Sequence, residues 1–205
     1  MTHTLHRSGD PAGLAHDYVI FAIAAQGVNS QGAAPKFKRF ADIALKYNPV
    51  NFGDMKSGNM FTVGKDEILG NFRENSIVHA VFTDKETVLK CLKEVKEADI
   101  GLSIVVSGLV HEVGEACCAA GTAAHTVEHS LGIHGAREKL PAPAVLDIST
   151  MCGHGMVAFS LVEHLVDEVK AGRTTVEKAA RELAKQCVCG VFNPVRAAEI
   201  IQGLV

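Results

Sequence analysis

The apolar residues of the first half fall into short blocks whose spacing predicts alternating strands and helices. Residues 17–25 form an apolar run bounded by polar residues, which is typical of a buried strand. Helical spacing follows in residues 35–47, whereas residues 48–64 are rich in Asn and Gly and indicate a loop. A strand, a helix opened by a Thr-x-x-Glu pattern and another strand are then expected, at residues 76–82, 83–98 and 100–107. This order predicts a strand-helix-strand crossover, which is right-handed by default.

The second half is predicted to be mainly helical, with one further strand. Apolar stripes and capping signals predict helices over residues 111–120, 125–132, 161–169, 176–186 and 193–201. Residues 144–149 indicate a strand. These elements predict an α+β fold with a mixed sheet and helices packed in layers. We expect one compact domain, with a structural half in residues 1–110 and the candidate chemistry in residues 111–205.

Composition and charge narrow the class of protein. The chain has 205 residues, of which 47% are hydrophobic and 21% charged, and this is typical of a folded globular protein. The net charge of -3 gives no basic field, so we expect no nucleic-acid partner. Without a long apolar run or an apolar core in residues 1–7, the sequence predicts no membrane partner and a cytoplasmic location. A homo-oligomer is compatible with the apolar C-terminal helices.

The sequence His125-Thr126-Val127-Glu128-His129 is the most informative candidate for chemistry. On a helix, His125 and His129 would lie one turn apart on the same side, so both imidazoles could bind one zinc or iron(II) ion. Glu128 could then take a proton from a ligand of that ion. The alternative is an amphipathic helix on which these three side chains face water.

Cysteine supplies the further candidate ligands, because six cysteines in a reducing compartment indicate metal or thiol chemistry. If their segment is extended, Cys187 and Cys189 share a face and can reach one metal ion; otherwise they are reduced thiols in a strand or turn. Cys152 lies in a glycine-flanked turn, where backbone amides would lower the pKa of a nucleophilic or acid/base thiol. His154 could pair with Cys152 or bind an anionic group of a substrate or cofactor. The alternative is that the glycines only shape a turn around a buried Cys152.

The second half resembles the S-ribosylhomocysteine lyase family, whose fold is related to that of pitrilysin-like zinc peptidases. The resemblance covers residues 121–203 and rests on three segments in the family's order, at residues 125–129, 147–153 and 186–190. It implies that His125, His129 and one of Cys187 or Cys189 bind iron(II) or zinc, with Glu128 and Cys152 as proton-transfer groups. The chain departs from the family pattern in its Cys152-Gly153 order, and residues 1–110 show no counterpart of the family's substrate-binding segment.

Three functions follow from these residues. The first is a metal-dependent lyase or isomerase that removes a proton next to a carbonyl of a small polar metabolite, with carbon–sulfur bond cleavage as a further step. The second is an iron–sulfur or redox protein that uses Cys117 or Cys118 with the other three cysteines of the second half. Since adjacent residues on a helix point about 100° apart, at most one of Cys117 and Cys118 faces a given site. The third is a non-catalytic metal-binding or ligand-binding module.

Overall fold

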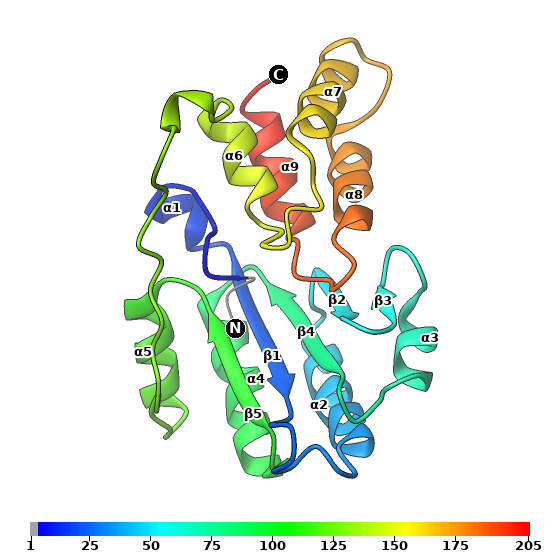
Figure 1. Ribbon diagram of the computed structural model, residues 1–205, viewed down its shortest axis with the longest axis vertical. Helices are drawn as coiled ribbons and strands as arrows, with labels where there is room; N and C mark the ends of the chain where they lie inside the picture. Colours follow the sequence, from blue (N-terminus) through cyan, green and yellow to red (C-terminus); the bar gives the residue numbers. More distant parts are fainter. Residues whose placement is uncertain (1–3) are drawn as a thin grey trace.

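The computed structural model describes residues 4–205, so the first three residues of the stretch on which the signal-peptide expectation rests lie outside it. Its sheet has five strands in the order β3-β2-β4-β1-β5 (Figure 1). The strands are β1 (Tyr18–Ile23), β2 (Asn51–Asp54), β3 (Gly58–Asn59), β4 (Ile77–Phe82) and β5 (Ser103–Ser107). Among the described residues, no helix combines the length and the apolar character that crossing a bilayer requires.

Strand β1 lies in the middle of the pairing scheme and is antiparallel to both of its neighbours, β4 and β5. Strands β4 and β5 therefore run in the same direction, joined by the helix between them and separated by β1. The expected strand-helix-strand unit is present, and the α+β class is confirmed. Every paired strand of the described chain is antiparallel to its neighbour, in place of the mixed pairing expected, because β1 inserts between the two parallel strands.

The helices fall into groups on the two sides of the sheet, as Figure 1 shows. They are α1 (Pro11–Leu14), α2 (Ala34–Lys46), α3 (Lys65–Gly70), α4 (Lys85–Ala98), α5 (Val110–Ala119), α6 (Pro143–Ser149), α7 (Phe159–Lys170), α8 (Val176–Gln186) and α9 (Pro194–Gln202), with a short 3-10 helix η1 (Arg137–Lys139). Tyr18, Ile20 and Ala22 of β1 pack in one core with α2, α4 and α5. Val19 and Phe21 point to the opposite face, where α6 to α9 form a second core.

Most helix boundaries follow from capping residues. Helix α9 begins at Asn193-Pro194 as predicted, with the Asn193 side chain accepting from the amides of Val195 and Arg196. Helix α4 is capped by Asp84, whose carboxylate accepts from the Thr87 amide, and the predicted cap at Thr83 is wrong by one residue. Asp and Thr both cap helices well, so local sequence does not decide between them.

The helix expected over residues 125–132 is not formed. Residues 122–136 contain neither helix nor strand, and their side chains are exposed. Gly121 precedes this segment and Gly132 lies within it, both in the left-handed region, at φ 69° and 84°. A short helix with no apolar face to bury is marginal in water, which explains the extended path. We call residues 122–136 the strap.

Two other expectations are corrected. Residues 144–149, expected as a strand, belong to α6, where Pro143 occupies the first turn and Val145 and Ile148 face the second core. A short apolar run fits a strand or a buried helix equally well, and the proline at the first helical position favours the helix. Residues 48–64, expected as a loop, contain β2 and β3, whose Asn and Gly residues are rare in strands.

Candidate thiol and metal site

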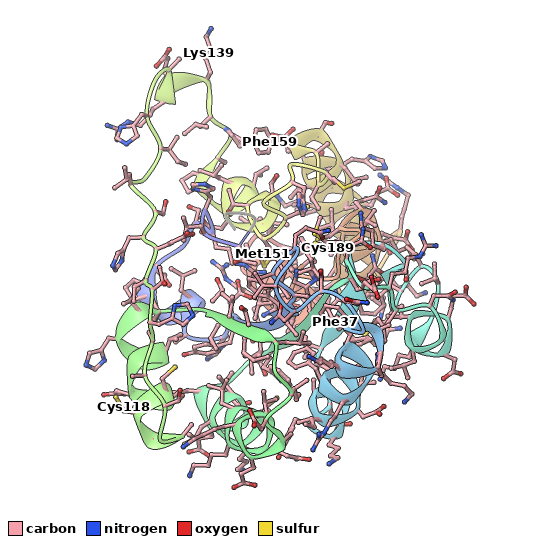
Figure 2. All side chains as sticks on the ribbon, turned by 60° about the horizontal axis from the view of Figure 1, so that its bottom comes forward. Phe37, Cys118, Lys139, Met151, Phe159 and Cys189 are labelled. Carbon is pink, nitrogen blue, oxygen red and sulfur yellow. The ribbon has the colours of Figure 1, made fainter. Side chains whose placement is uncertain are left out.

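Three cysteines and one histidine of the second half meet where α8 ends and the loop between α6 and α7 turns. The sulfurs of Cys187 and Cys189 are 3.8 Å apart, and the Cys189 sulfur is 3.7 Å from Nδ1 of His154. Cys152 contacts Cys187 through a side-chain hydrogen bond. All three cysteines are buried, at 2% exposure or less, and belong to the second core. Figure 2 shows Cys189 in the crowded centre of the molecule, not far from Met151.

Backbone amides point at the sulfurs of this cluster. The amide of Val191 donates to both Cys187 and Cys189, and the amides of His154 and Met156 donate to Cys152. Such bonds favour the thiolate form of a cysteine. They are present because two tight turns, closed by the bonds Gly190 N–H to Cys187 O and Gly155 N–H to Cys152 O, wrap the backbone around the sulfurs.

The three thiols differ in acidity. The hydrogen bond from Cys187 lowers the pKa of Cys189, and the Val191 amide and the Arg7 charge act in the same direction against burial. The pKa of Cys152 is raised by its hydrogen bond to Cys187 and by burial, so the expected lowering at Cys152 is wrong. The pKa of Cys187 is raised as well, because its bond to Cys189 and burial outweigh the opposing hydrogen bond from Cys152. Cys189 is therefore the only one of these three thiols whose pKa is lowered.

Strands β2 and β3 contact the Cys-x-Cys-Gly turn at residues 187–190 and support it. A Cβ atom added to Gly53 would lie 2.7 Å from the Cys189 carbonyl oxygen and 2.9 Å from Cα of Gly190, so the two backbones are in direct contact. The buried Asn59 amide donates to the carbonyl of Cys187 at 2.9 Å. Sequence reasoning missed this support, since the stretch that carries Gly53 and Asn59 was expected to be a loop.

A buried charge cluster lies beside the thiols. Asp17 binds Arg7 through one carboxylate oxygen and Arg196 through the other, the latter at 3.0 Å, and each side chain is 6% exposed or less. Arg7 also donates to the carbonyl of Val191, the residue whose amide points at the cysteines. Two guanidinium groups and one carboxylate leave one net positive charge. The charge of Arg7 acts to lower the pKa of Cys189, so it favours the thiolate form of that cysteine.

His154 gives the cluster its exposed side. It lies in the exposed segment of residues 153–156, where Gly155 adopts φ 68°. Ser149 anchors the loop by donating to the Val157 carbonyl at 2.6 Å. His154 is thus the only exposed residue among the four of the cluster.

The predicted histidine pair lies elsewhere. His125 and His129 are in the exposed strap, and the strap lines a cleft with β5 and α5 that includes none of Cys152, Cys187 and Cys189. Nδ1 of His125 is 2.7 Å from the hydroxyl of Thr126. Glu128 is exposed on the same segment. The structure therefore brings together Cys152, Cys187, Cys189 and His154 of the predicted residues, and it does not bring His125, Glu128 or His129 to them.

Cys117 and Cys118 are also separate from the cluster. Cys117 packs in the core on the opposite face of the sheet, and Cys118 is exposed. Figure 2 shows Cys118 on α5, far from Cys189. Neither of them supplies a fourth cysteine to the cluster in this arrangement.

The distances within the cluster suit a single metal ion. Ligand bonds of about 2.3 Å to sulfur and 2.05 Å to nitrogen, at tetrahedral angles, place two sulfurs about 3.8 Å apart and a sulfur and nitrogen about 3.6 Å apart. The separations of 3.8 Å and 3.7 Å match two edges of such a site. Nevertheless, no three Cys, His, Asp or Glu side chains of residues 4–205 already form a metal-binding group. The four side chains contact one another in the order Cys152, Cys187, Cys189 and His154. Binding of one ion by all four requires rotation of side chains.

Comparison of the chain with protein-family models, with curated proteins and with solved structures gave no match. The resemblance to the S-ribosylhomocysteine lyase family stays a prediction, and so do the ligand roles that it implies for His125 and His129. What the molecule can do is therefore inferred from the geometry of its own residues.

Proposed function

We propose that this protein is a metalloprotein whose centre is formed by Cys152, Cys187, Cys189 and His154 around one thiophilic ion, zinc or iron. The observation that carries the proposal is the pair of ligand-to-ligand distances, 3.8 Å and 3.7 Å, which are those of a tetrahedral site. The amides that point at the sulfurs and the net positive charge around Arg7 support it, since both stabilise thiolates.

The exposed loop suggests how such a centre would act. Three buried sulfurs would hold the ion, whereas His154 lies in a glycine-flanked loop and is the ligand most easily displaced. Displacement would open a coordination position to a small polar metabolite, which the ion would polarise as a Lewis acid. We place this activity in the cytoplasm, because a site of reduced cysteines needs a reducing compartment.

Metal content of variants tests the proposal. We expect about one cobalt(II) ion per wild-type chain under anaerobic conditions, with absorption bands typical of several thiolate ligands. Cys189→Ser is expected to abolish these bands, and His154→Ala to weaken binding and shift them. Cys118→Ser is the matched control, because that cysteine is exposed and remote from the cluster.

The double variant His125→Ala, His129→Ala separates this proposal from the lyase prediction. If the ion is held by the thiol cluster, the double variant retains wild-type metal content and bands. Loss of the ion in the double variant, with retention in Cys189→Ser, would instead establish a histidine site in the strap and refute the cluster.

A dithiol redox centre is the second candidate, favoured by the 3.8 Å separation of the Cys187 and Cys189 sulfurs and by the lowered pKa of Cys189. The Cys189 thiolate would attack an external disulfide, and Cys187 would then displace the second thiol to form an intramolecular disulfide. Oxidised glutathione is a suitable probe, because it would be reduced to two thiols while the protein loses two hydrogens. The metal-free protein is incubated with oxidised glutathione and its mass is then measured. A mass lower by two hydrogens supports the redox centre, and an unchanged mass contradicts it.

A further inference from the structure

A cleft of about 1010 Å³ opens on the side of the molecule where the sheet ends. Its walls are the whole of β5, the adjoining part of α5 and residues 122–130 of the strap. Figure 1 shows the chain leaving α5 and returning along the outer side of the sheet toward α6. The cleft includes no residue of the thiol cluster, although Arg7, which interacts with Cys189, is among its lining residues.

Strand β5 presents an open hydrogen-bonding edge to this cleft. It pairs with β1 on one side, and within residues 4–205 no other strand pairs with it. Two contacts hold the strap: Lys96 donates to the Gly121 carbonyl at 2.6 Å just before it begins, and His6 contacts the hydroxyl of Ser130 within it at 3.4 Å. No hydrogen bond described for residues 4–205 joins residues 122–130 to β5. An edge with free amides and carbonyls is a template for a further strand.

The size of the cleft corresponds to one extended segment. A strand occupies about 4.8 Å across the sheet, 3.4 Å along the chain and 10 Å between layers, hence about 160 Å³ per residue. At that value, a strand as long as the five residues of β5 needs about 800 Å³, and the volume of about 1010 Å³ is large enough for it.

The walls define the chemistry of the occupant. Apolar side chains predominate in the lining, and its charged residues are of both signs, such as Lys96 and Asp99; the apolar set comprises Val95, Ile100, Leu102, Ile104, Val106 and Val113. A hydrocarbon chain would leave the β5 edge without hydrogen-bond partners, whereas a peptide backbone supplies them. We propose that the cleft binds an extended, uncharged peptide segment of another polypeptide, which adds to the sheet as a strand beside β5.

Selection from a random peptide library on the wild-type protein supplies the probe. We expect enriched peptides to be uncharged, with apolar residues at alternate positions, and to slow hydrogen exchange of the β5 amides that do not pair with β1. Methylation of alternate amide nitrogens on the paired edge of the peptide should weaken binding on the order of tenfold or more, since each removes a main-chain hydrogen bond. Methylation on the opposite edge should have a smaller effect.

The variant Val127→Asp tests the location of the site. Val127 is 54% exposed and lines the cleft, so a carboxylate there should weaken peptide binding without unfolding the protein. Val28→Asp is the matched control, as Val28 is 84% exposed and outside the cleft. Enrichment of no peptide, or binding that tolerates Val127→Asp and both methylations, would overturn the proposal. So would light scattering that shows a dimer abolished by Val127→Asp, because a second copy would then be the occupant.

Discussion

The contact between Gly53 and the Cys-x-Cys-Gly turn gives the sharpest test of how the sheet supports the thiol cluster. In Gly53→Ala, the new Cβ atom would lie 2.7 Å from the carbonyl oxygen of Cys189 and 2.9 Å from Cα of Gly190. Both are backbone atoms, so no side-chain rotation relieves the overlap, and the turn must move away from β2. Overpacking of this kind costs about 1–3 kcal/mol. For a chain of this size, that corresponds to a fall in Tm of roughly 2–12 °C.

The same displacement should change metal binding. Because Cys187 and Cys189 both lie in this turn, a shift of its backbone alters the 3.8 Å separation of their sulfurs. Thermal unfolding followed by circular dichroism gives the loss of stability, and titration with cobalt(II) gives the affinity. Gly70→Ala is the matched control, since a Cβ added at Gly70 meets nothing within 4 Å. An unchanged Tm and an unchanged cobalt affinity in Gly53→Ala would show that β2 does not position the cysteines.

Three further predictions concern polar groups. Asn59→Ala leaves the Cys187 carbonyl without its donor and should lower the free energy of unfolding by about 1–3 kcal/mol, whereas the exposed Asn71→Ala should change it little; urea unfolding measures both. Asp17→Asn leaves two buried guanidinium groups uncompensated and should cost about 3–5 kcal/mol in the same assay, and a loss below 1 kcal/mol would contradict the charge argument. The hydrogen bond to Glu94 raises the pKa of Tyr47 to about 12. The stability that this hydrogen bond contributes is therefore complete below pH 10 and lost between about pH 10 and 12. Ultraviolet titration of Tyr47 should show that Glu94→Gln removes the pKa shift.

The strongly periodic parts of the fold could be predicted from the sequence. Strand β1 is a continuous apolar run that is buried on both faces, and helices α2, α4, α7 and α9 each have one apolar face of clear period. Burial of these residues decides the structure of each element. Strands β2 and β3 could not be found in this way, because their Asn and Gly residues serve contacts with a turn more than 120 residues later in the chain. Such residues are chosen for tertiary contact and not for strand propensity.

The candidate site was predicted in part. The cysteines at positions 152, 187 and 189 were expected to lie together, and they do, whereas the imidazole beside them is His154 and not His125 or His129. The sequence Cys152-Gly-His154-Gly indicates that His154 lies near Cys152, since a tight turn at the glycines brings both side chains to one side. The pattern His-x-x-Glu-His brings its two imidazoles to one side only on a helix. Residues 122–136 have no apolar face that would stabilise a helix.

The buried charges link these observations to one physical requirement. Asp17 neutralises only one of its two arginine partners, and the Arg7 guanidinium, 6% exposed, interacts with Cys189. The Arg7 charge acts to lower the pKa of Cys189, so it favours the thiolate form of that cysteine. A thiolate in an amide-lined turn is the form that a soft metal ion binds, so the charge cluster supports the proposed metal site.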